Sequence, residues 1–148
     1  MAQTVLALAA LCCVVFVSLN VQRSGHRRAL QTLKSEVEAH ATSVGAQLLD
    51  RAGTLPFDGP AVGPGTPLER VPSLDQWDGR SGTAEVPAGQ DTLRFQVRAR
   101  VEPVVKNGGA FVPAPAAASA PFRKLTLSVE GRLSVSTTVE RVYADLSR

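Results

Sequence analysis

The chain has 148 residues, a formal net charge of +3 and an aromatic content of only 5%. Its basic residues are spread along the sequence, whereas a nucleic-acid surface needs clustered lysine and arginine interleaved with stacking rings. We therefore assign no nucleic-acid partner. The two cysteines, Cys12 and Cys13, are adjacent inside an apolar run. Neighbours on a helix point about 100° apart and cannot easily form a disulfide. We therefore interpret both cysteines as small apolar residues, with acylation or metal binding as the alternative.

Residues Thr4 to Val21 form an apolar run without a charged side chain. At about 1.5 Å per residue this run covers roughly 27 Å as a helix, just enough to cross a bilayer core. A cleaved signal peptide is the alternative, but no basic residue precedes the run and the sequence after Val21 is a poor cleavage context. Arg23, Arg27, Arg28 and Lys34 follow the run, and the positive-inside rule would then place the C-terminal part in the cytoplasm.

A helical pattern continues past the apolar run. Apolar residues recur every three or four positions, which is typical of a helix that packs on other helices: Leu30, Leu33, Val37, Ala41, Val44 and Leu48. No proline interrupts the pattern, and Gly25 and Gly45 each cost only about 1 kcal/mol relative to alanine. We expect one helix from residue 4 to about 51, ended by Gly53 and Pro56.

The segment 54–90 is dense in proline and glycine, so we expect an irregular loop. Five apolar residues could fix this loop to the rest of the fold: Phe57, Leu68, Val71, Leu74 and Trp77. Asp75-Gln-Trp-Asp-Gly has two carboxylates that could bind calcium. We favour a turn around a buried tryptophan.

Alternating apolar and polar residues predict strands over 91–102, 123–130 and 133–143. Val142 is out of phase, which predicts a bulge or strand end near Arg141. Short connections favour an antiparallel sheet of three or four strands. Its apolar face should be covered by the helix between Lys34 and Arg51, giving an α+β fold. The inward residues expected to face Val37, Val44 and Leu48 are Leu93, Phe95, Val97, Leu125, Leu127, Val129, Val135 and Val139.

The sequence contains no catalytic motif that we can identify. His40 has Glu36 one helical turn away, whereas His26 has no such partner, and one pair is too few ligands for a metal site. We therefore predict no enzyme activity, no metal and no cofactor. Arg94, Arg98 and Arg100 form a basic stripe on one strand. We expect a solvated face or ion pairs to Glu130 and Glu140, and a surface ligand is the alternative.

The layout resembles that of type IV pilins and pseudopilins, in which an apolar helix runs into an amphipathic half, a loop and an antiparallel sheet. Two stretches are similar to that family. Ala46-Gln-Leu-Leu-Asp-Arg-Ala-Gly-Thr-Leu-Pro-Phe-Asp resembles the exit from the long helix. Lys124-Leu-Thr-Leu-Ser-Val-Glu with Ser136-Thr-Thr-Val-Glu-Arg-Val-Tyr resembles the paired last strands of minor pilins.

One family feature is missing. The resemblance implies a glutamate at the fifth position of the processed chain, where this sequence has Val5, and no acidic residue occurs before Glu36. Either the chain is already processed, or it is a divergent or unprocessed member. The role of that glutamate in setting helix register is assigned to no residue here.

We expect a structural subunit that starts in the inner membrane and is polymerised by a pilus or secretion machinery into a homopolymeric extracellular filament. The expected regions are an anchor and filament core (1–53), a loop (54–90) and a sheet domain (91–148). Helix residues expected to contact neighbouring copies are Leu8, Leu11, Val15, Leu19, Leu30, Leu33 and Val37. The alternatives are a bitopic membrane protein that acts as a coiled-coil component of an envelope complex, and a membrane-tethered ligand-binding module.

Overall fold

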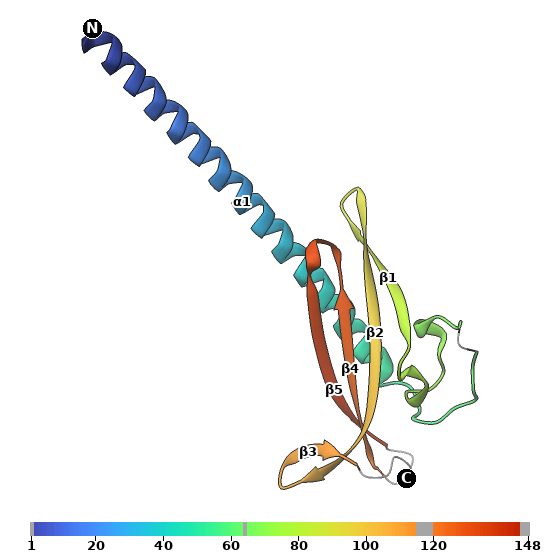
Figure 1. Ribbon diagram of the computed structural model, residues 1–148. Helices are drawn as coiled ribbons and strands as arrows, with labels where there is room; N and C mark the ends of the chain where they lie inside the picture. The colour runs from blue at the N-terminus through green and yellow to red at the C-terminus, as the bar shows by residue number, and fades with distance from the viewer. Residues whose placement is uncertain (1, 64, 115–119, 146–148) are drawn as a thin grey trace. The chain divides into compact units, whose positions relative to one another are not determined.

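The computed structural model describes the backbone of residues 2–63, 65–114 and 120–145, with side chains described from Val14 onward. A long helix, α1 (Ala2–Ala52), precedes the five strands of an antiparallel sheet (Figure 1). The strands are β1 (Ser81–Ala88), β2 (Asp91–Asn107), β3 (Ala110–Pro113), β4 (Phe122–Glu130) and β5 (Ser136–Ala144). Short 3₁₀ turns are η1 (Leu68–Arg70), η2 (Asp75–Trp77) and η4 (Arg132–Ser134). The chain forms two compact units, Met1–Glu36 and Val37–Arg148.

The predicted α+β class is confirmed, and so is the single helix. Helix α1 continues through Asn20 and Gly25 without a break. It ends where expected, because Gly53 follows Ala52 and its N–H donates to the carbonyl of Leu49 at 3.1 Å. A glycine just past the last turn is the usual helix stop.

The sheet has the order β1-β2-β4-β5, and β3 pairs with the far end of β2. It therefore contains more strands than the three or four that we expected. The additional strand β1 lies within segment 54–90, so the prediction that this whole segment is a loop is wrong for residues 81–88. A two-residue turn at Gly89-Gln90 joins β1 to β2, and Gly89 has a φ of 64°. Glycine adopts that backbone conformation without steric cost.

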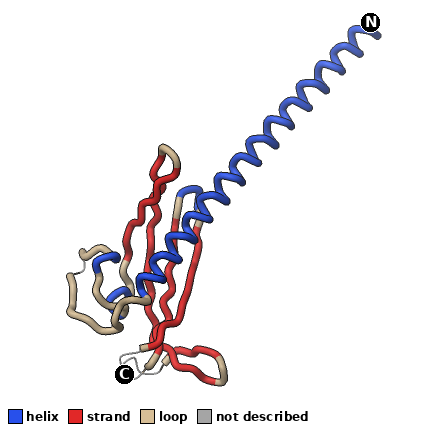
Figure 2. Tube along the Cα trace, turned by 180° about the vertical axis from the view of Figure 1, so that it is seen from behind, coloured by secondary structure: helices blue, strands red, loops and turns tan. Residues whose placement is uncertain are grey.

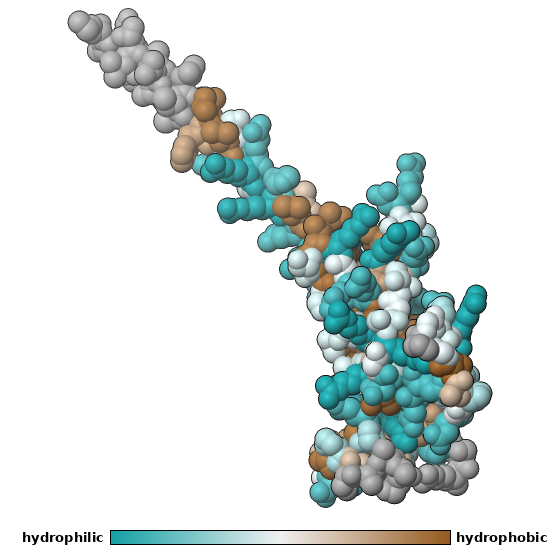
Figure 3. All heavy atoms as spheres, turned by 45° about the vertical axis from the view of Figure 1, so that its right-hand side comes forward, coloured by the Kyte–Doolittle hydropathy of each residue, from teal (hydrophilic) through white to brown (hydrophobic). Residues whose placement is uncertain are grey.

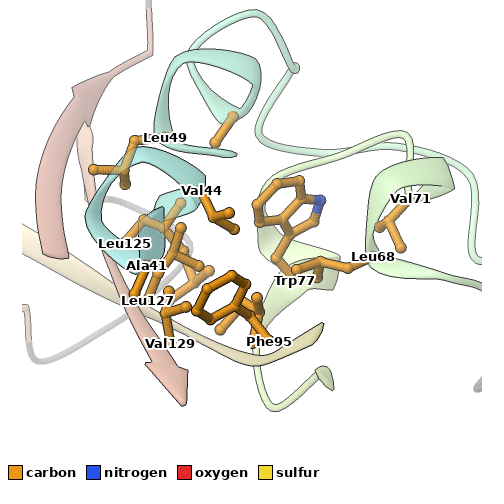
Figure 4. Close-up of a cluster of buried hydrophobic side chains, with 14 of the residues drawn as sticks. Ala41, Val44, Leu49, Leu68, Val71, Trp77, Phe95, Leu125, Leu127 and Val129 are labelled. Atoms are coloured by element: carbon orange, nitrogen blue, oxygen red, sulfur yellow. The ribbon is translucent and has the colours of Figure 1, made fainter. Parts of the chain in front are cut away.

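The C-terminal half of α1 lies against the sheet (Figure 2) and supplies one side of the core. Its buried apolar side chains are Val37, Ala41, Val44, Leu49 and Ala52. Leu48, predicted to be in the core, is only half-buried. Five strand residues predicted to face the helix are buried, namely Phe95, Val97, Leu125, Leu127 and Val129, and so is Val135 just before β5. Leu93 and Val139 are half-buried. Figure 4 shows Phe95, Leu125, Leu127 and Val129 in this core. The helix approaches β5 closely at Gly45, where an added Cβ would lie 2.6 Å from a methyl group of Val139.

The loop between α1 and β1 closes the rest of the core. All five apolar residues predicted to fix it are buried, and Leu74 and Trp77 are fully excluded from solvent. Arg123 of β4 holds this loop through both carboxylate oxygens of Asp75, at 2.7 and 3.0 Å. The Arg123 guanidinium also lies 5.2 Å from the ring centroid of Phe57, within the range of a cation–π contact.

The last strand differs from the prediction in two respects. It begins at Ser136 rather than Leu133, because Leu133 has a φ of 59° in the turn η4 and its side chain is exposed. The expected bulge near Arg141 is absent, since the pairing of β4 with β5 is continuous from Phe122↔Ala144 to Glu130↔Ser136. Arg141 instead points to the helix side, where it forms an ion pair with Asp50 at 2.6 Å.

Candidate functional site

The N-terminal part of α1 presents apolar side chains to solvent. Val14 and Phe16 are each 69% exposed, and Val15, Val17, Leu19 and Val21 are also exposed. At 100° per residue, the run Val14-Val15-Phe16-Val17 points in all directions around the helix axis. A helix that is apolar all round is stable only when lipid or protein surrounds it. This surface is therefore the strongest candidate for a functional site.

The predicted assembly residues have different surroundings. Leu8 and Leu11 lie outside the residues whose side chains are described. Val15, Leu19, Leu30 and Leu33 are 51%, 49%, 46% and 46% exposed, so a partner can reach them. Val37 is 2% exposed because it packs in the core of its own unit.

The predicted span, Thr4 to Val21, lies mostly outside the described side chains. Within the part of the chain whose side chains are described, no helix combines the length and hydropathy needed to cross a membrane.

The basic stripe on β2 is on the solvent face of the sheet, but its three arginines differ. Arg94 pairs with Glu85 of β1 at 2.8 Å, and Arg100 pairs with Glu102 at 2.7 Å. Arg98 lies between Ser81 and Ser128 on the neighbouring strands.

Ion pairs do form on this face, but not with the expected carboxylates. Glu140 binds Lys124, and no ion pair of Glu130 occurs among the described residues. The sequence did not indicate Glu85 as a partner because β1 was not predicted. It did not indicate Glu102 because this residue lies two positions from Arg100 on the same strand, whereas partners were expected on neighbouring strands. Only Arg98 of the stripe has no ion-pair partner among the described residues.

The two carboxylates of the Asp75-Gln-Trp-Asp-Gly turn both have structural roles. Asp75 binds Arg123, and Asp78 accepts a hydrogen bond from the N–H of Val101 at 2.9 Å. Trp77 between them is fully buried, as predicted for a turn around a tryptophan. In the described ranges, no three histidine, cysteine or acidic side chains come together as metal ligands.

Arg80 also helps to hold this loop. The Arg80 guanidinium donates to the carbonyls of Gln76, Gly63 and Val62 at 2.7, 2.9 and 3.0 Å. These hydrogen bonds to the loop backbone account for the position of the Arg80 side chain. A groove of about 330 Å³ separates α1 from β1, with Val44, Leu48 and Val86 in its wall and Arg51, Glu69 and Glu85 among its charged lining residues. These groups do not form a nucleophile–base pair.

Comparison of this chain with protein-family models, with curated proteins and with solved structures gives no match.

Proposed function

We propose that this chain is a pilin-like structural subunit that polymerises through its N-terminal helix into an extracellular filament. One observation carries the proposal: a helix that is apolar all round at Val14–Val17 is continuous with a helix half that forms the core of a sheet unit. The second half of α1 is covered by its own sheet. Among the described side chains of the first half, the apolar residues from Val14 to Val21 are exposed, and in this proposal lipid or other chains cover them.

The energetic argument concerns the solvent of that first half. Burying a valine, leucine or phenylalanine side chain stabilises by about 1.5–3 kcal/mol relative to leaving it in water. Lipid supplies this burial while the subunit is in the inner membrane. After extraction by an assembly machinery, the same residues are buried by the helices of neighbouring copies. The sheet units then form the outer surface of the filament.

A second function, the coiled-coil component of a bitopic envelope complex, is favoured by one observation. The first cations of the chain, Arg23, Arg27 and Arg28, follow the apolar run, as in a span whose C-terminal side faces the cytoplasm. In that case the exposed residues Leu30 and Leu33 would pack on a partner helix.

Truncation of one exposed helix residue separates the two functions. Lipid accepts any apolar side chain, but a bundle of packed helices loses contacts wherever a side chain is shortened. Val15→Ala should leave the amount of protein in the membrane fraction unchanged and lower the yield of sheared filaments. Leu133→Ala is the matched control, because Leu133 is 47% exposed but belongs to the sheet unit. Unchanged filament yield in Val15→Ala and in similar truncations, or no filament containing this chain, would favour the envelope complex.

A further inference from the structure

A cluster of cations follows the apolar end of α1 and contains no acidic residue. Arg23, Arg27, Arg28 and Lys34 are exposed, and no aspartate or glutamate occurs in the sequence before Glu36. Among the described residues, none of these four side chains forms an ion pair. The cluster is therefore available to an anionic partner outside the chain.

Helix geometry concentrates these charges. Arg23, Arg27 and Lys34 are separated by four and seven residues, so they lie on one face, and Arg28 is about 100° further round. Arg23 lies only about 3 Å along the axis beyond Val21, the last residue of the apolar run. Figure 3 shows this change along the helix from hydrophobic to hydrophilic surface. We call Arg23, Arg27 and Arg28 the basic collar.

We propose that the basic collar binds the phosphate groups of anionic phospholipids while the apolar end of the helix is in the bilayer. The inference rests on the proposed function, in which the subunit occupies a membrane before assembly. A helix whose apolar end fills the hydrocarbon places the next residues at the level of the headgroups. Guanidinium groups match phosphate oxygens with two parallel hydrogen bonds, and they keep their charge at any physiological pH.

A second copy of the chain fits the collar less well. In a bundle of parallel helices, collars of neighbouring copies approach one another and repel. The first carboxylates on this helix are the exposed Glu36 and Glu38, and two carboxylates in each copy are too few to neutralise three arginines and a lysine in each copy. The collar therefore stabilises the membrane-bound subunit over the assembled one.

Native mass spectrometry of the full-length chain in a non-ionic detergent tests the proposal. Equal amounts of phosphatidylglycerol and phosphatidylcholine are added, and the ratio of the two bound lipids is measured. The collar variant R23Q/R27Q/R28Q should lose its preference for phosphatidylglycerol by on the order of five-fold for each arginine that contacts a phosphate. The matched control R94Q/R98Q/R100Q removes the same charge from the sheet and should keep the preference.

Further measurements identify the source of the phosphate. Inorganic phosphate at the same ionic strength as a chloride control should not displace the bound lipid, because the site needs the headgroup next to the apolar end. The proposal is overturned if the wild type shows no preference, if the collar variant keeps it, or if the sheet control loses as much.

Filament yield is measured in parallel and reports on the proposed function separately. Under the lipid proposal the collar variant keeps or increases its filament yield. A fall in yield with unchanged lipid preference would instead assign the collar to a neighbouring copy. Lipid preference without any filament would leave the collar assigned and reject the filament.

Discussion

Replacing Asp75 with asparagine should destabilise the sheet unit by about 2–4 kcal/mol, because it leaves the Arg123 guanidinium without its carboxylate. Breaking a buried ion pair by removing one partner costs about 3–5 kcal/mol. The Arg123 side chain is 9% exposed, but that of Asp75 is 34% exposed, so solvent lowers the cost below the upper part of that range. The hydrogen bond to the Asp75 carboxylate, as the first cause, raises the pKa of Arg123, and the variant loses this stabilisation of the charge. Arg123 stays charged in the variant because a guanidinium is not deprotonated in proteins.

Trp77 provides the assay. It is the single tryptophan of the chain, it is fully buried, and it is two residues from Asp75. Its fluorescence can follow urea unfolding of the full-length protein in a mild detergent. With a urea dependence of about 2 kcal/mol per molar, the midpoint should fall by roughly 1–2 M.

A double variant distinguishes the lost charge pair from lost packing. Asp75→Leu combined with Arg123→Met replaces the pair with apolar side chains, and such replacements of buried pairs are often close to neutral. The double variant should therefore be more stable than Asp75→Asn. An unchanged midpoint in Asp75→Asn, or a double variant less stable than the single one, would refute this account of the loop.

Two further predictions concern contacts of α1. Burial, as the first cause, raises the pKa of Tyr143 above its ordinary value of 10.0. The neutral phenol therefore contributes fully to stability below pH 10, and this contribution is lost as the pH rises through the higher pKa of the folded state. Tyr143→Phe should be less stable than the wild type near neutral pH, with the difference narrowing above pH 10 in urea titrations. Gly45→Ala should destabilise the protein by about 1–3 kcal/mol, because the added Cβ would overpack against Val139. Gly25→Ala should instead stabilise the helix by up to about 1 kcal/mol, because no atom lies near its added Cβ. Thermal melting of both variants checks this contrast, and equal shifts would contradict it.

Strong periodicity made most of the fold predictable. The five alternations of β2 and the apolar spacing of α1 each extend over many residues, so strand, helix and the faces they bury followed directly. Strand β1 was missed because its inward positions include Gly82 and Ala84, whose small side chains give a weak alternation, and because Pro87 argues against a strand. A proline is tolerated there because β1 is an edge strand.

Features that depend on tertiary contacts could not be read from the sequence. The Asp75–Arg123 pair joins residues far apart in the chain, and spacing carries no signal for such a contact. Leu133 was predicted to begin the last strand because the alternation starts there, but it lies in the turn η4 with a φ of 59°. For the candidate site, the apolar run and the cations after it were predictable from the sequence. The structure added which of the apolar residues are exposed, and it removed Val37 from that set.

The continuity of α1 across the two units also has a mechanical consequence. Tension applied to the first half of the helix passes through its backbone hydrogen bonds and enters the sheet unit at Val37. There it is resisted together by core contacts along the second half, by the Arg141–Asp50 ion pair and by the hydrogen bond from the Tyr143 hydroxyl to the Leu49 carbonyl. When many contacts share a load, they must break together for the unit to open. The rate of forced unfolding is then set by the barrier to unfolding of the whole unit. The packing of α1 on the sheet therefore also allows the helix to transmit tension to the folded sheet unit.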